Sequence, residues 1–203
     1  MPISVGMSSA RGALDDVSFP AVLSAAKDGE GWAVEQLFLD LQPRLLRFLR
    51  SVEPAAADDL AGEVWLAMTR GIGRFNGDLP GFRAWVFTVA RRRLADHRRA
   101  AGRRPTAPAE SEFFQELGGS SDTAMDVIDR LSAQAAVDLI ASSLPEEHAE
   151  VLMLRVLGEL DVMRVAEVVG RSPNWVRVTQ HRALRRLGDV LDRAASEEIA
   201  GIL

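Results

Sequence analysis

Apolar side chains recur at every third or fourth position along most of the 203-residue chain, and this spacing is the feature that most restricts its fold. Phe82, Trp85, Val86 and Val89, for example, stand at i, i+3, i+4 and i+7, which places them on one face of a helix. No segment of the sequence alternates convincingly between apolar and polar residues, as a half-buried strand would. The pattern therefore predicts an all-α protein.

The expected helices fall into two groups, which we interpret as two small helical domains over residues 18–102 and 127–194. Apolar spacing and capping residues predict helices in the first domain over about 18–29, 32–52, 58–70 and from Phe82 onward. Pro43 is expected to bend or divide the second of these helices. In the second domain the expected helices cover about 127–142, 145–157, 161–169 and 173–194.

The segment between the two domains has a different composition, rich in Ala, Gly, Pro, Ser and acids. We interpret residues 103–126 as a flexible acidic linker, because residues 105–129 carry six acids and no base. Residues 1–17 are expected to be disordered, and residues 195–203 to form a short tail.

The charge of the chain is strongly segregated. The formal net charge is −5, which argues against a protein that binds nucleic acid on its own. However, residues 83–104 hold eight arginines and one acid, a local charge of +7, and residues 171–187 hold five arginines and no acid. Blocks of one sign favour a functional surface, because a merely soluble surface intersperses its charges.

Composition also excludes several classes of protein. Cysteine is absent, so disulfides, thiolate metal sites and cysteine nucleophiles are excluded. No apolar stretch approaches the roughly 20 residues that a membrane span needs. We therefore expect a cytoplasmic protein with no membrane insertion.

The strongest local motif is residues 161–187, DVMRVAEVVGRSPNWVRVTQHRALRRL. Ala166, Gly170 and Val176 have the spacing of a helix-turn-helix, in which a small residue lets two helices approach and a glycine reverses the chain. The Ser-Pro pair after the glycine predicts the start of the second helix. The alternative is an ordinary helical hairpin with a solvated arginine face. We expect the second helix to bind DNA. The residues expected to face a groove are Asn174, Arg177, Thr179, Gln180 and His181. Those expected to contact phosphates are Arg182, Arg185 and Arg186.

A second candidate surface is the glycine-rich segment 71–81, which we expect to be a loop. Phe75, Asn76 and Asp78 lie in this segment, directly before a basic helix. That combination suits the binding of an unstacked base of single-stranded DNA, because stacking, hydrogen bonds and backbone charge act together. The alternative is a plain connection between helices.

A third cluster, Asp58, Asp59 and Glu63, lies at the start of an expected helix. These acids lack a nearby histidine and a glycine-rich phosphate cradle, so we interpret them as a solvated helix start or a protein-docking surface. We expect no catalytic residue, no metal site and no cofactor.

Taken together, segments 30–102 and 131–194 resemble a bacterial RNA polymerase sigma factor of the extracytoplasmic-function (ECF, group IV) type. The resemblance covers about two thirds of the chain, and the order of two separate modules makes it specific. The matching stretches are PRLLRFLR, DDLAGEVWLAM, RFNGD, FRAWVFTVARRRLADHRR, LPEEHAEVLMLRVLGELDVMRVAEVVG and VRVTQHRALRRL.

The resemblance implies a role for each segment. Residues 30–102 correspond to sigma region 2, whose acids (here Asp58, Asp59 and Glu63) dock on the β′ coiled coil of core RNA polymerase. The loop from Phe75 would capture a flipped base of the minus-ten promoter element. Residues 131–194 correspond to region 4, which reads the minus-thirty-five element and sits on the β flap. The basic helix would bind melting DNA through Arg83, Arg91, Arg92, Arg98 and Arg99.

We therefore predict a sigma factor that acts with core RNA polymerase and promoter DNA, and that an anti-sigma factor restrains. The alternative is a helix-turn-helix regulator that binds duplex DNA as a symmetric dimer, which leaves the first basic helix unexplained. An enzyme that uses Asp96 and His97, or the acids near residue 59, is a third possibility. The three histidines of the chain are scattered and give it little support.

Overall fold

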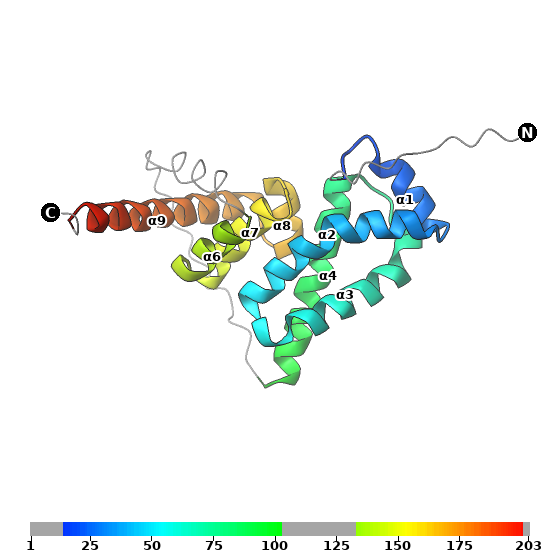
Figure 1. Cartoon of the computed structure of the whole chain (residues 1–203), viewed down its shortest axis with the longest axis horizontal. Helices are drawn as coiled ribbons and strands as arrows, with labels where there is room; N and C mark the ends of the chain where they lie inside the picture. The colour runs from blue at the N-terminus through cyan, green and yellow to red at the C-terminus, as the bar shows by residue number, and fades with distance from the viewer. Residues whose placement is uncertain (1–13, 103–132, 201–203) are drawn as a thin grey trace, which may run out of the picture.

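The computed structural model describes residues 14–102 and 133–200, and within these residues the chain forms helices and no strand (Figure 1). The all-α prediction is confirmed for this part of the chain. The N-terminal unit contains α1 (Phe19–Lys27), α2 (Gly31–Val52), the 3₁₀ turn η1 (Pro54–Ala56), α3 (Ala57–Gly71), a second turn η2 (Ile72–Arg74) and α4 (Leu79–Ala100). The C-terminal unit contains α6 (Ala133–Ser143), α7 (Glu146–Val156), α8 (Val162–Val169) and α9 (Pro173–Ala200).

Buried aromatic rings hold the N-terminal unit together. Phe19 of α1 and Phe82 of α4 have ring centroids 5.4 Å apart, and Phe48 of α2 meets Phe87 of α4 edge-to-face at the same distance. All four rings are almost completely buried, and each contributes about 1.5–3 kcal/mol by leaving water. Because α3 packs on both α2 and α4, and α1 packs on α2, these helices form a bundle.

The C-terminal unit has an aliphatic core. Each of its four helices contributes at least one completely buried side chain, including Ile140, Leu152, Val165 and Val176. α7 packs on α6, α8 and α9, so it holds the helix-turn-helix formed by α8 and α9. In Figure 1, α9 projects from the C-terminal unit away from the N-terminal unit.

The two units pack against each other. α4 lies against α8 and α2 lies against α6, and the buried apolar residues form one continuous cluster across both units. Ser51 of α2 donates a hydrogen bond to the sulfur of Met153 in α7 at 3.1 Å. The division into two domains stays a prediction, and the expected linker, residues 103–126, lies outside the described residues.

Two features of the N-terminal unit bear on the predicted helices. α2 is not divided at Pro43, because Leu41 and Leu45 on either side of it are buried and hold both halves in the core, and a bend at Pro43 stays a prediction. α4 begins at Leu79, inside the segment expected to be a loop, because the Asp78 carboxylate accepts a hydrogen bond from the Gly81 N–H at 2.7 Å and caps the helix.

Both ends of the described chain also extend further than expected. Leu14 is buried, so ordered structure begins before residue 18. α9 continues to Ala200 and not to residue 194, because residues 195–200 contain neither glycine nor proline to stop it.

Candidate nucleic-acid interface

Local hydrogen bonds build the helix-turn-helix. Gly170 ends α8 with a φ of +69°, a left-handed conformation that favours glycine, and its N–H donates to the Ala166 carbonyl at 2.9 Å. The Ser172 hydroxyl oxygen accepts from the Trp175 N–H at 3.1 Å and caps the start of α9. The turn and the cap predicted from the sequence are both confirmed.

One face of α9 is open and basic. At 3.6 residues per turn, Asn174, Arg177, His181 and Arg185 lie within about 80° of one another around the helix. His181 is half-buried, and the exposed side chains near this face are Asn174, Arg177, Arg182, Arg185 and Arg186. Arg186 also donates to the Ser143 carbonyl at 3.2 Å, which ties α9 to the end of α6. The face is suited to a polyanion, because no acid lies between residues 171 and 187.

The opposite side of α9 holds two residues that were expected to face a groove. Thr179 is only 5% exposed and belongs to the buried stripe with Val176, so its expected groove contact is wrong. Gln180 is half-buried, and its Oε1 atom is buried with no hydrogen-bond partner. Helical geometry places both residues toward the C-terminal core, so a DNA contact by Gln180 stays a prediction that needs its side chain to turn outward.

His148 of α7 lies behind this basic face. Burial lowers the pKa of His148, and the positive charges of Arg182 and Arg186 lower it further. The buried Nδ1 atom has no hydrogen-bond partner. The imidazole is therefore neutral at pH 7.

We expect acid to destabilise the fold through His148. Because the pKa of His148 is lower in the folded protein than in the unfolded chain, the unfolded chain takes up the proton first, and stability falls as the pH drops below about 6.5. Thermal melts between about pH 8 and pH 5 measure this slope, and His148→Gln is expected to flatten it. If stability depends on pH equally in the variant and in the parent protein, groups other than His148 cause the loss of stability in acid.

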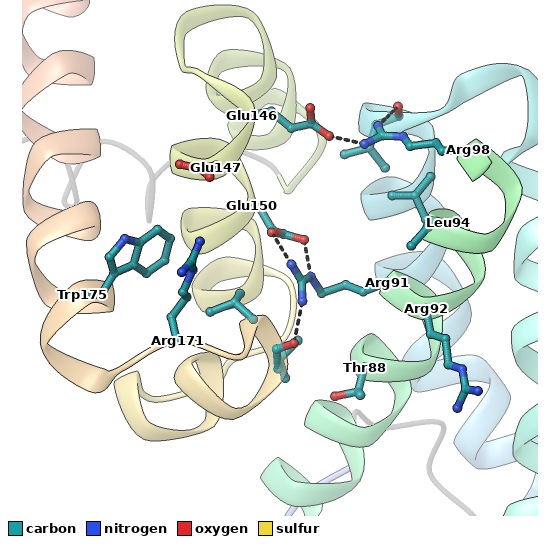
Figure 2. Close-up of a pocket in the computed structure, with 14 residues that line it drawn as sticks. Thr88, Arg91, Arg92, Leu94, Arg98, Glu146, Glu147, Glu150, Arg171 and Trp175 are labelled. Atoms are coloured by element: carbon teal, nitrogen blue, oxygen red, sulfur yellow. Dashed lines mark hydrogen bonds and ion pairs between the residues drawn. The ribbon is translucent and has the colours of Figure 1, made fainter. Parts of the chain in front are cut away.

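α4 directs two of its arginines into the cleft between the units (Figure 2). Arg91 binds both carboxylate oxygens of Glu150, at 2.6 and 3.1 Å, and donates to the Val168 carbonyl at 2.7 Å. Arg98 pairs with Glu146 of α7 and donates to the Val52 carbonyl at 3.0 Å. Arg91 and Arg98 thus contact the C-terminal unit in this arrangement, and their DNA contacts stay predictions.

Arg83 is buried, with only 5% of its surface exposed. Its guanidinium lies between Asp40 of α2, at 3.3 Å, and Glu159 in the turn between α7 and α8. Arg44 binds the same Glu159 carboxylate at 2.7 Å. The sequence places Arg83 in a basic block, but in this structure its side chain does not reach the solvent.

Glu159 is held as a carboxylate. Burial alone would raise the pKa of Glu159, but hydrogen bonds and charges from Arg44 and Arg83 outweigh burial and hold the pKa below its ordinary value. Its backbone φ is +52°, and it is the only non-glycine residue with a positive φ in the described part of the chain.

Two arginines of α4 remain exposed. Arg92 is open to solvent at the edge of the cleft (Figure 2), and Arg99 is exposed while it pairs with Asp96 of the same helix at 2.6 Å. An exposed pair within one helix is weak, so Arg99 can exchange Asp96 for another anion. Arg92 and Arg99 are therefore the arginines of α4 that are exposed to solvent.

The loop before α4 is short and anchored. The ring of Phe75 stacks on Trp85 at 5.3 Å and meets Phe82 edge-to-face at 5.2 Å, so it packs on α4. Gly71 permits this packing, because a Cβ atom there would lie 2.6 Å from the Trp85 ring. Of the loop residues expected to bind a base, Asn76 is free of such packing and exposed. The carboxylate of Asp78 meets Arg164 of α8 at 3.2 Å.

The exposed face of α3 carries acids beside an apolar side chain. Asp59, Glu63 and Leu66 stand at i, i+4 and i+7, and all three are exposed. Asp58 pairs with Arg50 at 3.1 Å, and Glu63 lies 3.9 Å from Arg93. Leu66 is 58% exposed and was not identified from the sequence, where its position on the helix resembles that of a core leucine.

Two expected absences can be examined in the described residues. Within residues 14–102 and 133–200, no group of three or more histidines and acids is arranged to hold a metal ion. No helix among the same residues is long and apolar enough to cross a membrane.

Known proteins are similar to this chain in sequence and in fold. A family profile described as Sigma-70 region 2 matches residues 37–104, which contain the α3 acids, the loop and α4. The chain is also 34% identical to the ECF RNA polymerase sigma factor ShbA of Streptomyces griseus, over 82% of this chain and 92% of ShbA. The chain belongs to the ECF RNA polymerase sigma factors. The family resemblance inferred from the motifs is confirmed.

Further relatives agree with this assignment. This ECF sigma factor is 32% identical to SigD of Mycobacterium tuberculosis, over 83% of the chain and 82% of SigD. Its fold is similar to that of CnrH, solved in complex with the cytosolic domain of CnrY, with a TM-score of 0.57. The match covers 87% of this chain and 98% of CnrH at 19% identity, and it supports the helical fold alone.

Proposed function

We propose that this ECF sigma factor binds core RNA polymerase and directs it to promoters that have minus-thirty-five and minus-ten elements. The observation that carries the proposal is the open basic face of α9 on a capped helix-turn-helix. A second helix in a major groove is the docking mode of this motif. In region 2, the loop before α4 is proposed to bind the minus-ten element, and the exposed face of α3 is proposed to bind the polymerase.

α9 is proposed to read the minus-thirty-five element. Asn174, Arg177 and His181 lie on its open face and would reach base edges, with Gln180 joining them if its side chain turns outward. Phosphates would be bound by Arg182, Arg185 and Arg186.

The loop before α4 is proposed to bind the minus-ten element. Phe75 positions the loop by stacking on Trp85, and Asn76 and Asp78 present polar groups to an unstacked base. Arg92 and Arg99 would bind the DNA backbone from the exposed side of α4.

The acidic face of α3 is proposed to dock on the β′ coiled coil of the polymerase, and the C-terminal unit on the β flap. The docking surface consists of Asp58, Asp59 and Glu63, with Leu66 as its apolar member. Exposed acids around an exposed leucine suit a basic partner surface with an apolar centre.

The protein is proposed to act in the cytoplasm without a cofactor and without covalent catalysis of its own. An anti-sigma factor, the partner that the sequence resemblance implies, is proposed to restrain it.

A gel-shift assay with purified core polymerase and a set of promoter fragments tests the main proposal. We expect a shifted complex only when core polymerase and this protein are both present. Tight binding of a palindrome by a dimer without polymerase would instead favour an autonomous regulator.

Charge reversal on α3 is expected to weaken polymerase binding. Glu63→Arg replaces an attractive charge with a repulsive one at the centre of the docking surface, and we expect at least a tenfold rise in the Kd for core polymerase, about 1.4 kcal/mol. Fluorescence anisotropy of the labelled protein measures this Kd. Glu35→Arg, an equal reversal at an exposed site on α2, is the control, and equal losses in both variants would contradict the docking surface.

A further inference from the structure

An arginine and a tryptophan lie together at the start of the second helix of the helix-turn-helix. Arg171 lies in the turn between Gly170, which ends α8, and Ser172, which caps α9. Its guanidinium carbon is 5.5 Å from the centre of the Trp175 ring, within the range of a cation–π interaction. Figure 2 shows the two side chains next to each other. Neither residue belongs to the DNA contacts proposed for α9.

The charge of Arg171 is not neutralised by an acid. Three acids line the same cleft as Arg171, namely Glu146, Glu147 and Glu150. Glu146 and Glu150 each pair with an arginine of α4. In the part of the chain that the structure describes, no ion pair and no side-chain hydrogen bond of Arg171 is found. Arg171 therefore offers a positive charge and unused N–H donors from a half-buried position on the ring of Trp175.

Trp175 lies on the side of α9 that carries two arginines proposed to bind phosphates. Trp175, Arg182 and Arg186 stand at i, i+7 and i+11, within about 40° of one another around the helix. Both arginines are exposed, and this side borders the open face that carries Arg177 and Arg185. A helix in a groove meets base edges with one face and phosphates along its borders. We call the side defined by Trp175, Arg182 and Arg186 the phosphate side of α9.

The positions on the phosphate side are spaced widely enough to serve different phosphates. At about 1.5 Å per residue, Trp175 lies about 10 Å before Arg182, and Arg182 lies about 6 Å before Arg186. Each strand of a duplex carries one phosphate for about every 3.4 Å of the axis, so a row of phosphates borders each groove. Because Trp175 holds Arg171 at the front of the phosphate side, Arg171 adds a separate cation to it.

Stacking on Trp175 also prepares Arg171 for binding. An arginine side chain has many rotamers, and fixing them on binding costs conformational entropy. The ring restricts the guanidinium before DNA arrives and so lowers that cost. The ring attracts the positive charge of the guanidinium, whereas a phosphate accepts hydrogen bonds from its N–H groups. The stacked arginine can therefore bind a phosphate without leaving the ring.

We propose that Arg171 binds a phosphate of the DNA backbone next to the minus-thirty-five element, and that Trp175 is the positioning residue that holds Arg171 for this contact. The inference rests on the proposed function, because it adds one contact to the same DNA-binding helix-turn-helix. A backbone contact carries no sequence information, so its contribution to affinity is the same for every minus-thirty-five sequence.

The salt dependence of promoter binding tests the contact of Arg171. Promoter fragments are titrated with the complex of this protein and core polymerase between about 50 and 200 mM salt. Arg171→Gln removes the charge and leaves Trp175 in place. Because fewer counterions are released, we expect the slope of log K against log salt to flatten by about one, and the affinity at about 100 mM salt to fall about five- to tenfold. The loss should be equal on fragments with altered minus-thirty-five sequences, and an unchanged slope would overturn the contact.

Substitutions of Trp175 test the positioning. Trp175→Leu removes the aromatic face but no charge, so a merely structural role would lower the affinity without changing the salt slope. We expect the slope to flatten as it does in Arg171→Gln, and to keep the parent value in Trp175→Phe, because a phenyl ring also attracts a cation. Added to Arg171→Gln, Trp175→Leu should cause no further change in the slope. Circular dichroism checks that each variant is folded, and a parent slope in Trp175→Leu would overturn the positioning role.

Arg193→Gln is the matched control. Arg193 stands about five turns after Trp175, so it lies on the same side of α9, about 27 Å further along the helix. It is exposed, and it donates to the Asp189 carbonyl of its own helix at 2.9 Å. We expect neither the slope nor the affinity to change in this variant. A loss equal to that of Arg171→Gln would mean that any charge on α9 has this effect, and would contradict the proposal.

The outcomes separate this inference from the proposed function. If the complex binds promoters and the slopes of the parent, Arg171→Gln and Trp175→Leu agree, the inference is wrong and the sigma function stands. If Arg171→Gln flattens the slope and Trp175→Leu does not, the phosphate contact stands and the positioning role is wrong. Failure of the parent protein to bind any promoter together with core polymerase would contradict the proposed function itself.

Discussion

Phe82→Ala is expected to lower the free energy of unfolding of the N-terminal unit by about 3–5 kcal/mol. The ring is completely buried and contacts Phe19, Phe75 and Trp85, with centroids between 5.2 and 5.8 Å away. Its loss removes apolar burial and leaves a cavity at the point where α1, α4 and the loop before α4 meet. Against the 5–15 kcal/mol typical of a whole domain, this is a large fraction of the total.

Urea denaturation followed by circular dichroism measures the effect, and Phe38→Ala is the matched control. Phe38 is 41% exposed, and its ring centroid lies 5.1 Å from that of Trp65. We expect Phe38→Ala to cost about 1 kcal/mol or less. Equal destabilisation by the two substitutions would mean that the aromatic cluster around Phe82 does not hold the unit together.

The second large effect concerns α9, where Arg177→Ala and Arg185→Ala are expected to behave differently. Both arginines are exposed on the same face, but Arg177 lies near the start of α9, the part of the helix that is proposed to reach base edges. Arg177→Ala should cost about 1–3 kcal/mol on promoters with the preferred minus-thirty-five element and much less on others. Arg185→Ala should weaken binding evenly across sequences and flatten the salt slope by about one.

Promoter binding by the assembled polymerase complex, measured over a range of salt concentrations and with altered minus-thirty-five sequences, distinguishes the two substitutions. The preferred element can be selected from a randomised pool with the parent protein. If both variants lose affinity evenly, or both lose sequence preference, the division of roles along α9 is wrong.

Features set by neighbouring residues could be predicted from the sequence. The turn at Gly170 and the cap at Ser172 depend on hydrogen bonds within six residues, and both are found as expected. α4 begins earlier than predicted, although an aspartate followed by a leucine and a proline is itself a helix-start signal. The glycines of segment 71–81 favour a loop and so conflict with that signal.

The inter-unit contacts could not be predicted in the same way. Arg83 and Arg91 stand in a basic block that resembles a DNA-binding helix, and the acids that bind them are 76 and 59 residues away. Charge patterning in a sequence gives the sign of a surface but not its partner. The position of Glu159, with its positive φ, depends on the packing of two units and leaves no local signature.

The role of Phe75 also depends on tertiary packing. An aromatic residue beside glycines in a loop suits stacking on a base, yet here its ring stacks on Trp85 and packs against Phe82. The nearby apolar stripe that begins at Phe82 was the available signal, because an exposed ring next to such a stripe tends to join it. Phe75 therefore supports the loop, and Asn76 is the exposed polar residue beside it.

The sigma function is tested most directly by run-off transcription with purified core RNA polymerase on a genomic set of promoter fragments. We expect defined transcripts from a subset of fragments only when this protein is added, and none from core polymerase alone. Arg177→Ala should reduce these transcripts at promoters with the preferred minus-thirty-five element. The absence of protein-dependent initiation on every fragment of the set would contradict the account.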